Sequence, residues 1–392
     1  MTLANGRPLL AMPGPTNMPD RVLQAMMRPA EELASPSITG MTDSILADLK
    51  RVFRTSGETF IYAANGHGGW EAAFTNVLSR GDKVLVLASG RFAIGWGEMA
   101  GMMGADVEIL PGSWREAVDP AALEQRLRAD AGHAIKAVMT VQIDTASGVV
   151  NDIPAIRRAI DAAGHPALLM VDGVASIGCM QFEMDSWGVD VAMGASQKGL
   201  MGSPGLAFVA ANARALEAHQ SADMRSGYWD WTGRLTGLGY MKHCGTAPEH
   251  LLFGQRAALD MLFEEGLEAI WARHATLAAA THAAVEAWSA GGVLGFGVPE
   301  AAQRAPSVTA VLTQGVDPAI ITDFARDVCG VSLGLGIGDY ADRAFRIAHM
   351  GHLSAGALLG VLGAVELALQ AKGIPHGAGG VTAAIASLAK AV

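Results

Sequence analysis

The stretch Val189-Asp-Val-Ala-Met-Gly-Ala-Ser-Gln-Lys-Gly-Leu-Met201 places a single lysine, Lys198, directly after an apolar run. Residues 191–195 predict a short buried strand, and the polar residues and glycine that follow predict where it ends. A lysine at the end of a buried strand can lose its proton through desolvation and become a nucleophilic amine. The alternative is a lysine in a surface loop, since most lysines face solvent.

Length and composition favour a globular protein that acts on small molecules. The chain has 392 residues, enough for two domains with large cores. It is 51% apolar and 17% charged and has 48 glycines, which is typical of a well-packed protein with many tight turns. A net charge of −10 argues against nucleic acid and anionic membranes as partners, because either would need a basic patch.

The cysteines and the first residues indicate a reducing compartment. Cys179, Cys244 and Cys329 are too few and too far apart for a disulfide framework or a CxxC metal site, so we expect reduced thiols. No basic segment followed by an apolar core opens the sequence, and we therefore expect a cytoplasmic protein without a secretory signal. Residues 353–371 have the length of a membrane span, but Glu366 and the many Gly and Ala residues favour a packed core helix.

Apolar strand-like runs alternate with helical patterns in the first part of the chain. Helices are predicted over residues 44–54, 65–78, 92–103, 120–129 and 154–163, and strands over 59–63, 83–88, 135–141, 167–171, 191–195 and 205–210. Continuous apolar strands separated by helices predict an α/β fold with a mostly parallel sheet covered on both faces.

A change of pattern after Pro248 predicts a second domain. Alanine-rich helices end at residue 265 and run over 267–288, with Gly266 as a break between them. We therefore expect a large domain over residues 21–265 and a smaller α+β domain over 266–392, with strands at 307–312, 331–335 and 344–348 and two terminal helices. Residues 1–20 are expected to form an arm that is irregular and extended over residues 8–20, where four prolines occur.

The glycine-rich turn Asn65-Gly-His-Gly-Gly69 lies between a predicted strand and a predicted helix. Free backbone N–H groups and the positive end of the helix dipole suit a phosphate there. The dinucleotide fingerprint does not fit, because the third glycine is missing and no acid ends the next strand. A monophosphate is the better ligand, and a turn without any ligand is the alternative.

Asp172 ends the predicted strand over 167–171, where ligands bind in open α/β sheets. A loop-capping aspartate is the alternative. An amine such as that of Lys198 and an acid for a pyridinium nitrogen form the minimum set for pyridoxal phosphate chemistry. The two residues together therefore favour this cofactor.

Five segments in order resemble the class V aminotransferases of the alanine–glyoxylate and serine–glyoxylate group. They are Asn65-Gly-His67, Asp144-Thr-Ala-Ser-Gly148, Val171-Asp-Gly-Val-Ala-Ser176, Ser196-Gln-Lys-Gly199 and Phe345-Arg-Ile347. The resemblance extends over nearly the whole chain, from Pro13 onward. It implies the type I pyridoxal phosphate fold, with a mostly parallel seven-stranded sheet between helices and a smaller α+β domain, and a homodimer with shared active sites.

The resemblance also implies roles for individual residues. Lys198 would bond the cofactor and then carry the proton between the substrate's α-carbon and the cofactor, while Asp172 would keep the ring nitrogen protonated. Arg346 would clamp the substrate carboxylate with a bidentate fork. The other cofactor-binding positions would be Phe92 stacked on the ring, Thr145 at the ring oxygen, Asn65, Gly66, His67, Val174 and Gln197, and His243 and Thr246 from the other subunit.

Several of these residues have a structural alternative. Phe92 and Trp96 stand four apart on a predicted helix and could both be core. His67 is better interpreted as a loop residue that offers its backbone N–H than as an acid or base. His349 and His352 resemble a metal pair, but no acidic residue accompanies them, so we expect packing and no metal site.

The implied reaction is transamination, in which serine, alanine or aspartate donates its amine to glyoxylate or pyruvate. Alternatives are a pyridoxamine–pyruvate aminotransferase, a cysteine desulfurase-like lyase using Cys329, a nicotinamide-binding oxidoreductase and a non-catalytic binder. Two departures from the family's pattern leave the donor open. His243 stands where many relatives have Tyr or Phe, and Glu32-Leu-Ala-Ser-Pro36 replaces the Asp-His-Arg-Ser-Pro of serine– and aspartate–glyoxylate relatives.

Overall fold

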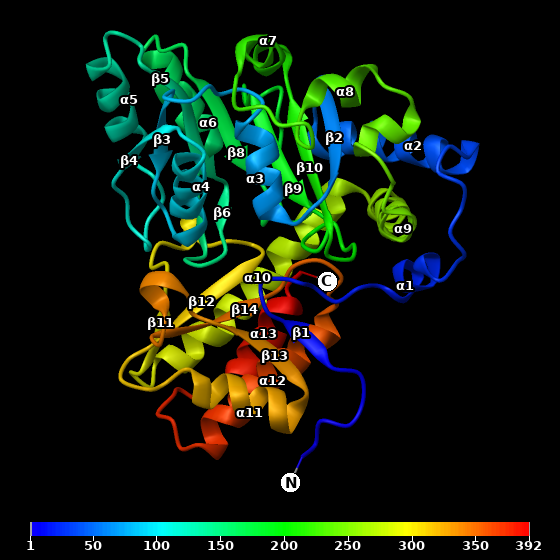
Figure 1. Ribbon diagram of the computed structural model, residues 1–392. Coiled ribbons are helices and arrows are strands. Elements are labelled where there is room, and N and C mark those ends of the chain that lie inside the picture. Colours follow the sequence, from blue (N-terminus) through cyan, green and yellow to red (C-terminus); the bar gives the residue numbers. More distant parts are fainter. Residues whose placement is uncertain (1, 392) are drawn as a thin grey trace.

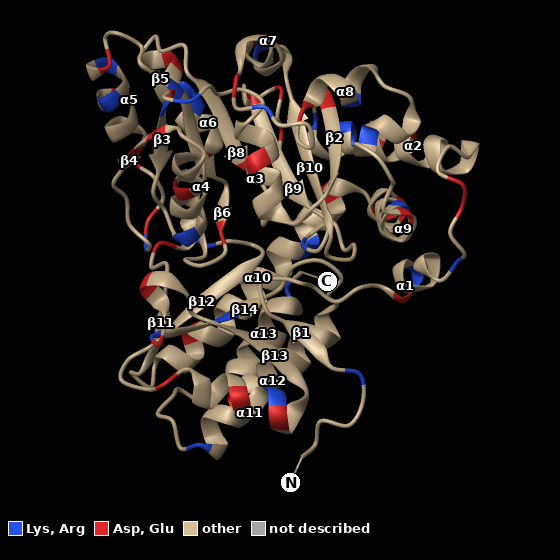
Figure 2. Ribbon diagram, in the orientation of Figure 1, with Lys and Arg blue, Asp and Glu red and all other residues tan. Residues whose placement is uncertain are grey.

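The computed structural model describes residues 2–391, and its helices and strands build two sheets with helices packed on them. In Figure 1 the elements of a seven-stranded sheet occupy the upper half and those of a five-stranded sheet the lower half. Helix α10 (Leu267–Ser289) connects the two, since its first residues pack in the upper core and its later residues in the lower one. Basic and acidic residues are interspersed over both halves (Figure 2).

The seven-stranded sheet is mostly parallel, as predicted. Its order is β2 (Glu58–Ala63), β10 (Leu206–Ala211), β9 (Val191–Ala195), β8 (Leu168–Asp172), β5 (Ile135–Val141), β3 (Lys83–Leu87) and β4 (Asp106–Leu110). Only β10 runs antiparallel to its two neighbours. The sequence patterns did not predict β4, because this edge strand is polar and partly exposed and lacks an apolar run.

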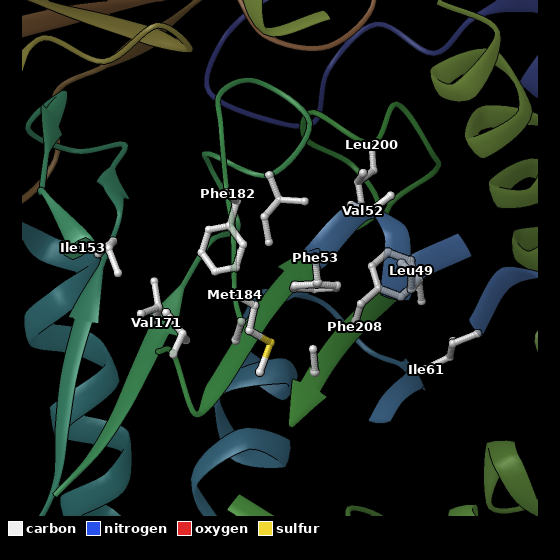
Figure 3. Close-up of a cluster of buried hydrophobic side chains, with 14 of the residues drawn as sticks. Leu49, Val52, Phe53, Ile61, Ile153, Val171, Phe182, Met184, Leu200 and Phe208 are labelled. Carbon is white, nitrogen blue, oxygen red and sulfur yellow. The ribbon is translucent and has the colours of Figure 1, made fainter. Parts of the chain in front are cut away.

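Helices cover both faces of this sheet because successive strand side chains point to opposite sides. On one face, residues such as Val171 and Phe208 pack with Phe53 of α2 (Pro36–Phe53) and with Phe182, as Figure 3 shows. The other helices of that face are α5 (Pro120–Ala129), α6 (Ile153–Ala162) and α9 (Glu249–Glu265). The opposite face packs against α3 (Gly66–Phe74), α4 (Arg91–Met102), α7 (Ala213–Ser221) and α8 (Trp231–Thr236).

The five-stranded sheet has the order β1 (Leu9–Ala11), β13 (Val331–Leu335), β14 (Ala344–Ala348), β12 (Val308–Thr313) and β11 (Leu294–Phe296). It packs with α10, α11 (Ala319–Cys329), α12 (Ala355–Ala371) and α13 (Gly380–Leu388). The predicted irregular segment over residues 8–20 is wrong for residues 9–11, which pair with β13 in parallel. The pairing partner lies more than three hundred residues away, so no local pattern could reveal it. The division into residues 1–20, 21–265 and 266–392 stays a prediction.

The apolar stretch at residues 353–371 forms α12, whose buried face lies in the core of the lower half. The interpretation as a packed core helix is therefore confirmed. Across residues 2–391, no helix combines the length and the apolar character needed to cross a membrane.

Short elements complete the chain. Helix α1 (Asp20–Met26) follows the first strand, and the hairpin β6 (Ile143–Asp144) and β7 (Val149–Val150) carries Thr145 in its turn. Single 3₁₀ turns occur at η1 (Gly239–His243), η2 (Ala301–Gln303) and η3 (Gly338–Tyr340). The hairpin lies beside the carboxyl ends of the parallel strands, since Gln142, the residue before it, donates its backbone N–H to the carbonyl of Asp172.

Candidate active site

A cavity of about 180 Å³ lies at the carboxyl ends of β8 and β9. The residues that line it come from the end of β8 and the loops after β2, β8 and β9, from α3 and the start of α4, and from the β6–β7 hairpin. Nine of the residues selected from the sequence are among them: Asn65, Gly66, His67, Phe92, Thr145, Asp172, Val174, Gln197 and Lys198. Trp70, Ile143 and Ala175 complete the lining.

Lys198 follows β9 and lines the cavity, so the surface-loop alternative is wrong. Its Nζ donates a hydrogen bond to the backbone carbonyl of Pro13. Burial, with a smaller contribution from the charge of Arg346, lowers the pKa of this amine to about 8. A substantial fraction of the amine is therefore neutral near pH 8, which is the form that acts as a nucleophile.

The N-terminal segment lies against this lysine, which the sequence did not indicate. Thr16 donates from Oγ1 to the Lys198 carbonyl over 3.2 Å, and its backbone N–H donates to the Gln197 carbonyl. A Cβ at Gly14 would lie 2.7 Å from both Cε and Nζ of Lys198, and Gly14 has a φ of +98°. A side chain at position 14 would collide with Lys198, and a positive φ strains any residue other than glycine. The close approach of the two segments therefore requires glycine at this position.

Asp172 ends β8 and is 4% exposed. Its Oδ1 accepts the Val174 backbone N–H at 2.7 Å, and its Oδ2 accepts the Trp70 indole N–H at 2.7 Å. Burial raises the pKa of the carboxyl to about 6, although both hydrogen bonds lower it. Asp172 thus lines the cavity and also caps the loop after β8 through the Val174 N–H, so the loop-capping alternative holds beside its place in the cavity.

Phe92 and Trp96 differ in environment. Trp96 is buried in the core, whereas Phe92, on the first turn of α4, lines the cavity. The ring of Phe92 lies 6.3 Å from that of Trp70, in an edge-on arrangement. The core alternative therefore holds for Trp96, and Phe92 remains available to a ligand.

Asp144 holds the start of α4, a role that the sequence did not predict. This fully buried carboxylate accepts the N–H groups of Phe92 (2.8 Å) and Ala93 (3.0 Å) with Oδ2 and that of Ala146 (2.9 Å) with Oδ1. Burial raises the pKa of this carboxyl, and the three backbone donors oppose part of that rise. One side chain thus places Phe92 and also the turn that contains Thr145.

The first turn of α3 faces the cavity through Asn65, Gly66 and His67. Asn65 caps the helix, since its Oδ1 accepts the N–H groups of His67 (3.0 Å) and Gly68 (3.3 Å). The His67 ring packs edge-on against Trp70 at 4.5 Å, and burial lowers the pKa of the imidazole. A neutral imidazole and the positive end of the α3 dipole therefore form this end of the cavity.

Arg346 on β14 is 8% exposed and lies beside the cavity. Its Nε and Nη2 donate to the Leu335 carbonyl at 2.9 and 2.7 Å, and its Nη1 donates to the Thr145 carbonyl at 2.9 Å. A guanidinium has five N–H groups, so these three bonds leave two for a carboxylate. Burial lowers the pKa of Arg346 to about 10, which keeps it charged at neutral pH.

His243 and Thr246 lie outside the cavity lining. His243 is buried with Nε2 3.0 Å from Thr42 Oγ1, and burial lowers the pKa of its imidazole to about 4. It is uncharged at neutral pH. Thr246 is exposed. Their contribution to the site of another subunit stays a prediction.

The other candidate residues have structural surroundings. His349 is buried with Nδ1 2.8 Å from the Pro306 carbonyl and Nε2 2.9 Å from Thr309 Oγ1, which confirms packing for this residue. His352 is exposed, so the packing interpretation is wrong for it. Cys329 ends α11 and does not line the cavity. Over the part of the chain that the structure describes, no group of three or more His, Cys, Asp or Glu residues could hold a metal ion.

Solved structures with this architecture define the class of protein. The chain is similar to the ureidoglycine–glyoxylate aminotransferase of Bacillus subtilis, with a TM-score of 0.89, 26% identity and 99% of each chain covered. It is also similar to the pyridoxamine–pyruvate aminotransferase of Mesorhizobium loti, with a TM-score of 0.90 and 28% identity. The match covers 99% of this chain and 98% of that one. The fold is the type I fold of pyridoxal phosphate-dependent enzymes.

The family model of the class V aminotransferases matches residues 9–336 of this chain. The chain therefore belongs to this family and is an aminotransferase. It is 42% identical to the serine–glyoxylate aminotransferase of Methylorubrum extorquens, with 97% of this chain and 96% of the relative covered. It is 39% identical to the L-aspartate–glyoxylate aminotransferase of Paracoccus denitrificans, with 93% of this chain and 91% of the relative covered. The resemblance read from the five segments is confirmed.

Gly90 provides a test of how Asp144 places Phe92. A Cβ at Gly90 would lie 2.3 Å from Cγ of Asp144 and 2.6 Å from each of its carboxylate oxygens. We expect Gly90→Ala to lower the free energy of unfolding by roughly 1–3 kcal/mol, the usual range for overpacking, as measured by urea denaturation. Because the φ of Gly90 is 167°, the cost arises from space and not from backbone strain.

Gly295→Ala is the matched control, because a Cβ there would have nothing within 4 Å and its φ also requires no glycine. Its unfolding free energy should stay within about 0.5 kcal/mol of the unaltered protein. Equal stability of the two variants would contradict the assigned role of Asp144.

Proposed function

We propose that the cavity binds pyridoxal phosphate. The donor set fits this group: an amine with a lowered pKa and a buried carboxylate face the same cavity, and a helix N-terminus forms part of its wall. When bound, the cofactor supplies an electron sink that stabilises negative charge at the α-carbon of a substrate. The observation that carries the proposal is that Lys198 and Asp172 line one cavity beside the cation of Arg346.

Each residue has a defined task in this proposal. Lys198 bonds the cofactor, and its amine then moves a proton at the α-carbon of the substrate. Asp172 accepts a hydrogen bond from the protonated ring nitrogen. Phe92 offers a flat apolar face to the ring, and Thr145 offers a hydroxyl to the ring oxygen. Asn65, Gly66, His67, Val174 and Gln197 form the remaining contacts with the cofactor.

Arg346 orients the substrate through its carboxylate. Its two unoccupied N–H groups suit a bidentate bond, and its hold on the Leu335 and Thr145 carbonyls limits the positions the guanidinium can take. This clamp binds any α-amino or 2-oxo acid, so it serves both half-reactions. The side chain of the donor is therefore recognised elsewhere in the site.

The proposed reaction transfers the amine of a small L-amino acid, namely serine, alanine or aspartate, to glyoxylate or pyruvate. Relatives named for serine and for aspartate, each with glyoxylate, share 42% and 39% identity with this chain over most of its length. Leu33, in the segment where the sequence departs from the family's pattern, packs against the core of the upper half. We place this activity in the cytoplasm.

A second candidate is a pyridoxamine–pyruvate aminotransferase, since an enzyme of that name is among the similar structures. In that reaction the pyridoxamine is a substrate and no cofactor phosphate is held. The positive end of the α3 dipole, which forms one end of the cavity, favours a phosphorylated cofactor instead.

Half-reactions test the function and separate the two candidates. Protein loaded with pyridoxal phosphate should absorb visible light, in a band typical of the lysine-bound cofactor. Adding serine, alanine or aspartate should bleach this band, and glyoxylate or pyruvate should restore it. Lys198→Ala should show no such band, while Lys136→Ala, at an exposed position of β5, should behave as the unaltered protein. Turnover with pyridoxamine alone would overturn the proposed reaction.

Arg346→Ala should raise the Michaelis constant for donor and acceptor by about tenfold to a hundredfold, because each loses a charge-assisted hydrogen bond. Arg346→Lys should recover part of this loss, since it keeps the charge but not the fork. The spectrum of the bound cofactor should not change. Loss of the cofactor in these variants would show that Arg346 supports the cofactor and not the substrate.

We further propose that two copies of the chain form a homodimer with shared sites. Leu235, Leu238 and Met241 are apolar and exposed, at 42%, 71% and 37%, on the segment that leads to Thr246. A second copy would cover this surface and bring Thr246 to the phosphate of the partner's site.

Mixed dimers test the shared site. Lys198→Ala inactivates a subunit's own site, whereas Thr246→Asp should repel the phosphate in the neighbour's site. Neither homodimer should turn over, but mixing the two after dissociation should restore up to about a quarter of the activity, the statistical share of intact sites. No recovery in mixtures shown to exchange subunits would place Thr246 at its own site, and turnover by the Thr246→Asp homodimer would place it at no site.

A further inference from the structure

Trp70 on α3 contacts Asp172 directly, although neither the spacing of motifs nor the resemblance selected it. It is 3% exposed, and its indole Nε1–H donates to Asp172 Oδ2 over 2.7 Å. An indole N–H is only ever a donor. This contact is therefore compatible with a carboxylate oxygen that carries no proton.

The two oxygens of Asp172 have different donors, and both donors favour the anion. Oδ1 accepts the backbone N–H of Val174, and Oδ2 accepts the indole N–H. Burial opposes ionisation, as does the negative charge of Asp144, while the positive charge of Lys198 favours it. The ionised form of Asp172 thus depends on a few short contacts that oppose a large cost of desolvation.

The indole is also fixed in place on three sides. It stacks nearly parallel on Trp96 at 6.3 Å and 17°, and the rings of His67 and Phe92 meet it edge-on at 4.5 and 6.3 Å. Rings packed in this way resist rotation, so the N–H group stays aimed at Asp172.

We propose that Trp70 is a positioning residue that keeps the Asp172 carboxylate ionised and oriented toward the ring nitrogen of the cofactor. The inference rests on the proposed function of this site. A protonated ring nitrogen needs an anionic partner, and a neutral carboxyl would supply a donor in place of an acceptor. Trp70 therefore acts on the electron sink through Asp172, without contact with the substrate.

The test measures the ionisation of Asp172 in the protein without cofactor. Trp70→Phe removes the N–H group and keeps an aromatic ring. Infrared difference spectra of the carboxyl C=O stretch against pH, with Asp172→Asn as the blank, report the pKa of this one group. In Trp70→Phe the acid dissociation constant of Asp172 should fall by about tenfold to a hundredfold, the usual effect of losing a hydrogen bond to a charged group.

Trp96→Phe is the matched control. Its indole is buried like that of Trp70 and stacks on it, but its Nε1–H finds no acceptor in residues 2–391. Phenylalanine at position 96 keeps an aromatic ring against the Trp70 indole, so Trp96→Phe should leave the titration of Asp172 nearly unchanged. Equal shifts of the Asp172 pKa in the two variants would overturn the proposal, because packing would then account for the effect. No shift in Trp70→Phe would also overturn it, because the indole N–H would then have no influence on Asp172.

A second variant covers the case in which Trp70→Phe does not fold. Benzothienylalanine at position 70 keeps the two fused rings and replaces the N–H group by sulfur, so it should shift Asp172 in the same direction. In loaded enzyme, kcat of the half-reaction should fall about tenfold or more while the KM of the donor stays nearly constant. A shifted Asp172 in a protein that never binds the cofactor would contradict the proposed function and leave the Trp70–Asp172 coupling standing.

Discussion

The parallel pairing of β8 with β9 is the constraint on which the site depends. Because the two strands run side by side, Asp172 at the end of β8 lies opposite Met193 of β9, and Lys198 follows a few residues later on the same edge. Parallel strands bring their carboxyl ends to one edge of a sheet, so an acid and an amine from separate segments meet in one cavity. The helices on the two faces bury the apolar side chains of these strands below that edge.

Burial of charge has a cost, and backbone groups offset it throughout the site. Asp172 and Asp144 accept backbone N–H groups, and Arg346 donates to two backbone carbonyls. These contacts also tie the two halves together, since Arg346 lies in the five-stranded sheet and Thr145 lies in the hairpin beside the larger one. Arg346, the proposed substrate clamp, therefore also helps to hold the two halves together.

Local patterns predicted the elements and residues whose signals are contained in a few neighbouring positions. The strand before Lys198, the strand before Asp172 and the glycine-rich turn at Gly66 are of this kind, and all three meet at the cavity. The features that were missed arise from contacts across the chain. β1 pairs with a distant strand, Gly14 lies against Lys198, and the indole of Trp70 reaches a carboxylate more than a hundred positions away.

The sequence by itself determined the fold class, the cofactor that suits the site and the residues that would carry the chemistry. Strand periodicity, glycine turns and the order of five motifs are properties of the chain, independent of its final packing. The tertiary structure decided which of these residues are buried, which are paired and what their ionisation states are. A pKa depends on desolvation and on the charges and donors nearby. For Lys198, Asp172 and Arg346, those neighbours come together only when the two sheets and the N-terminal segment pack around the cavity.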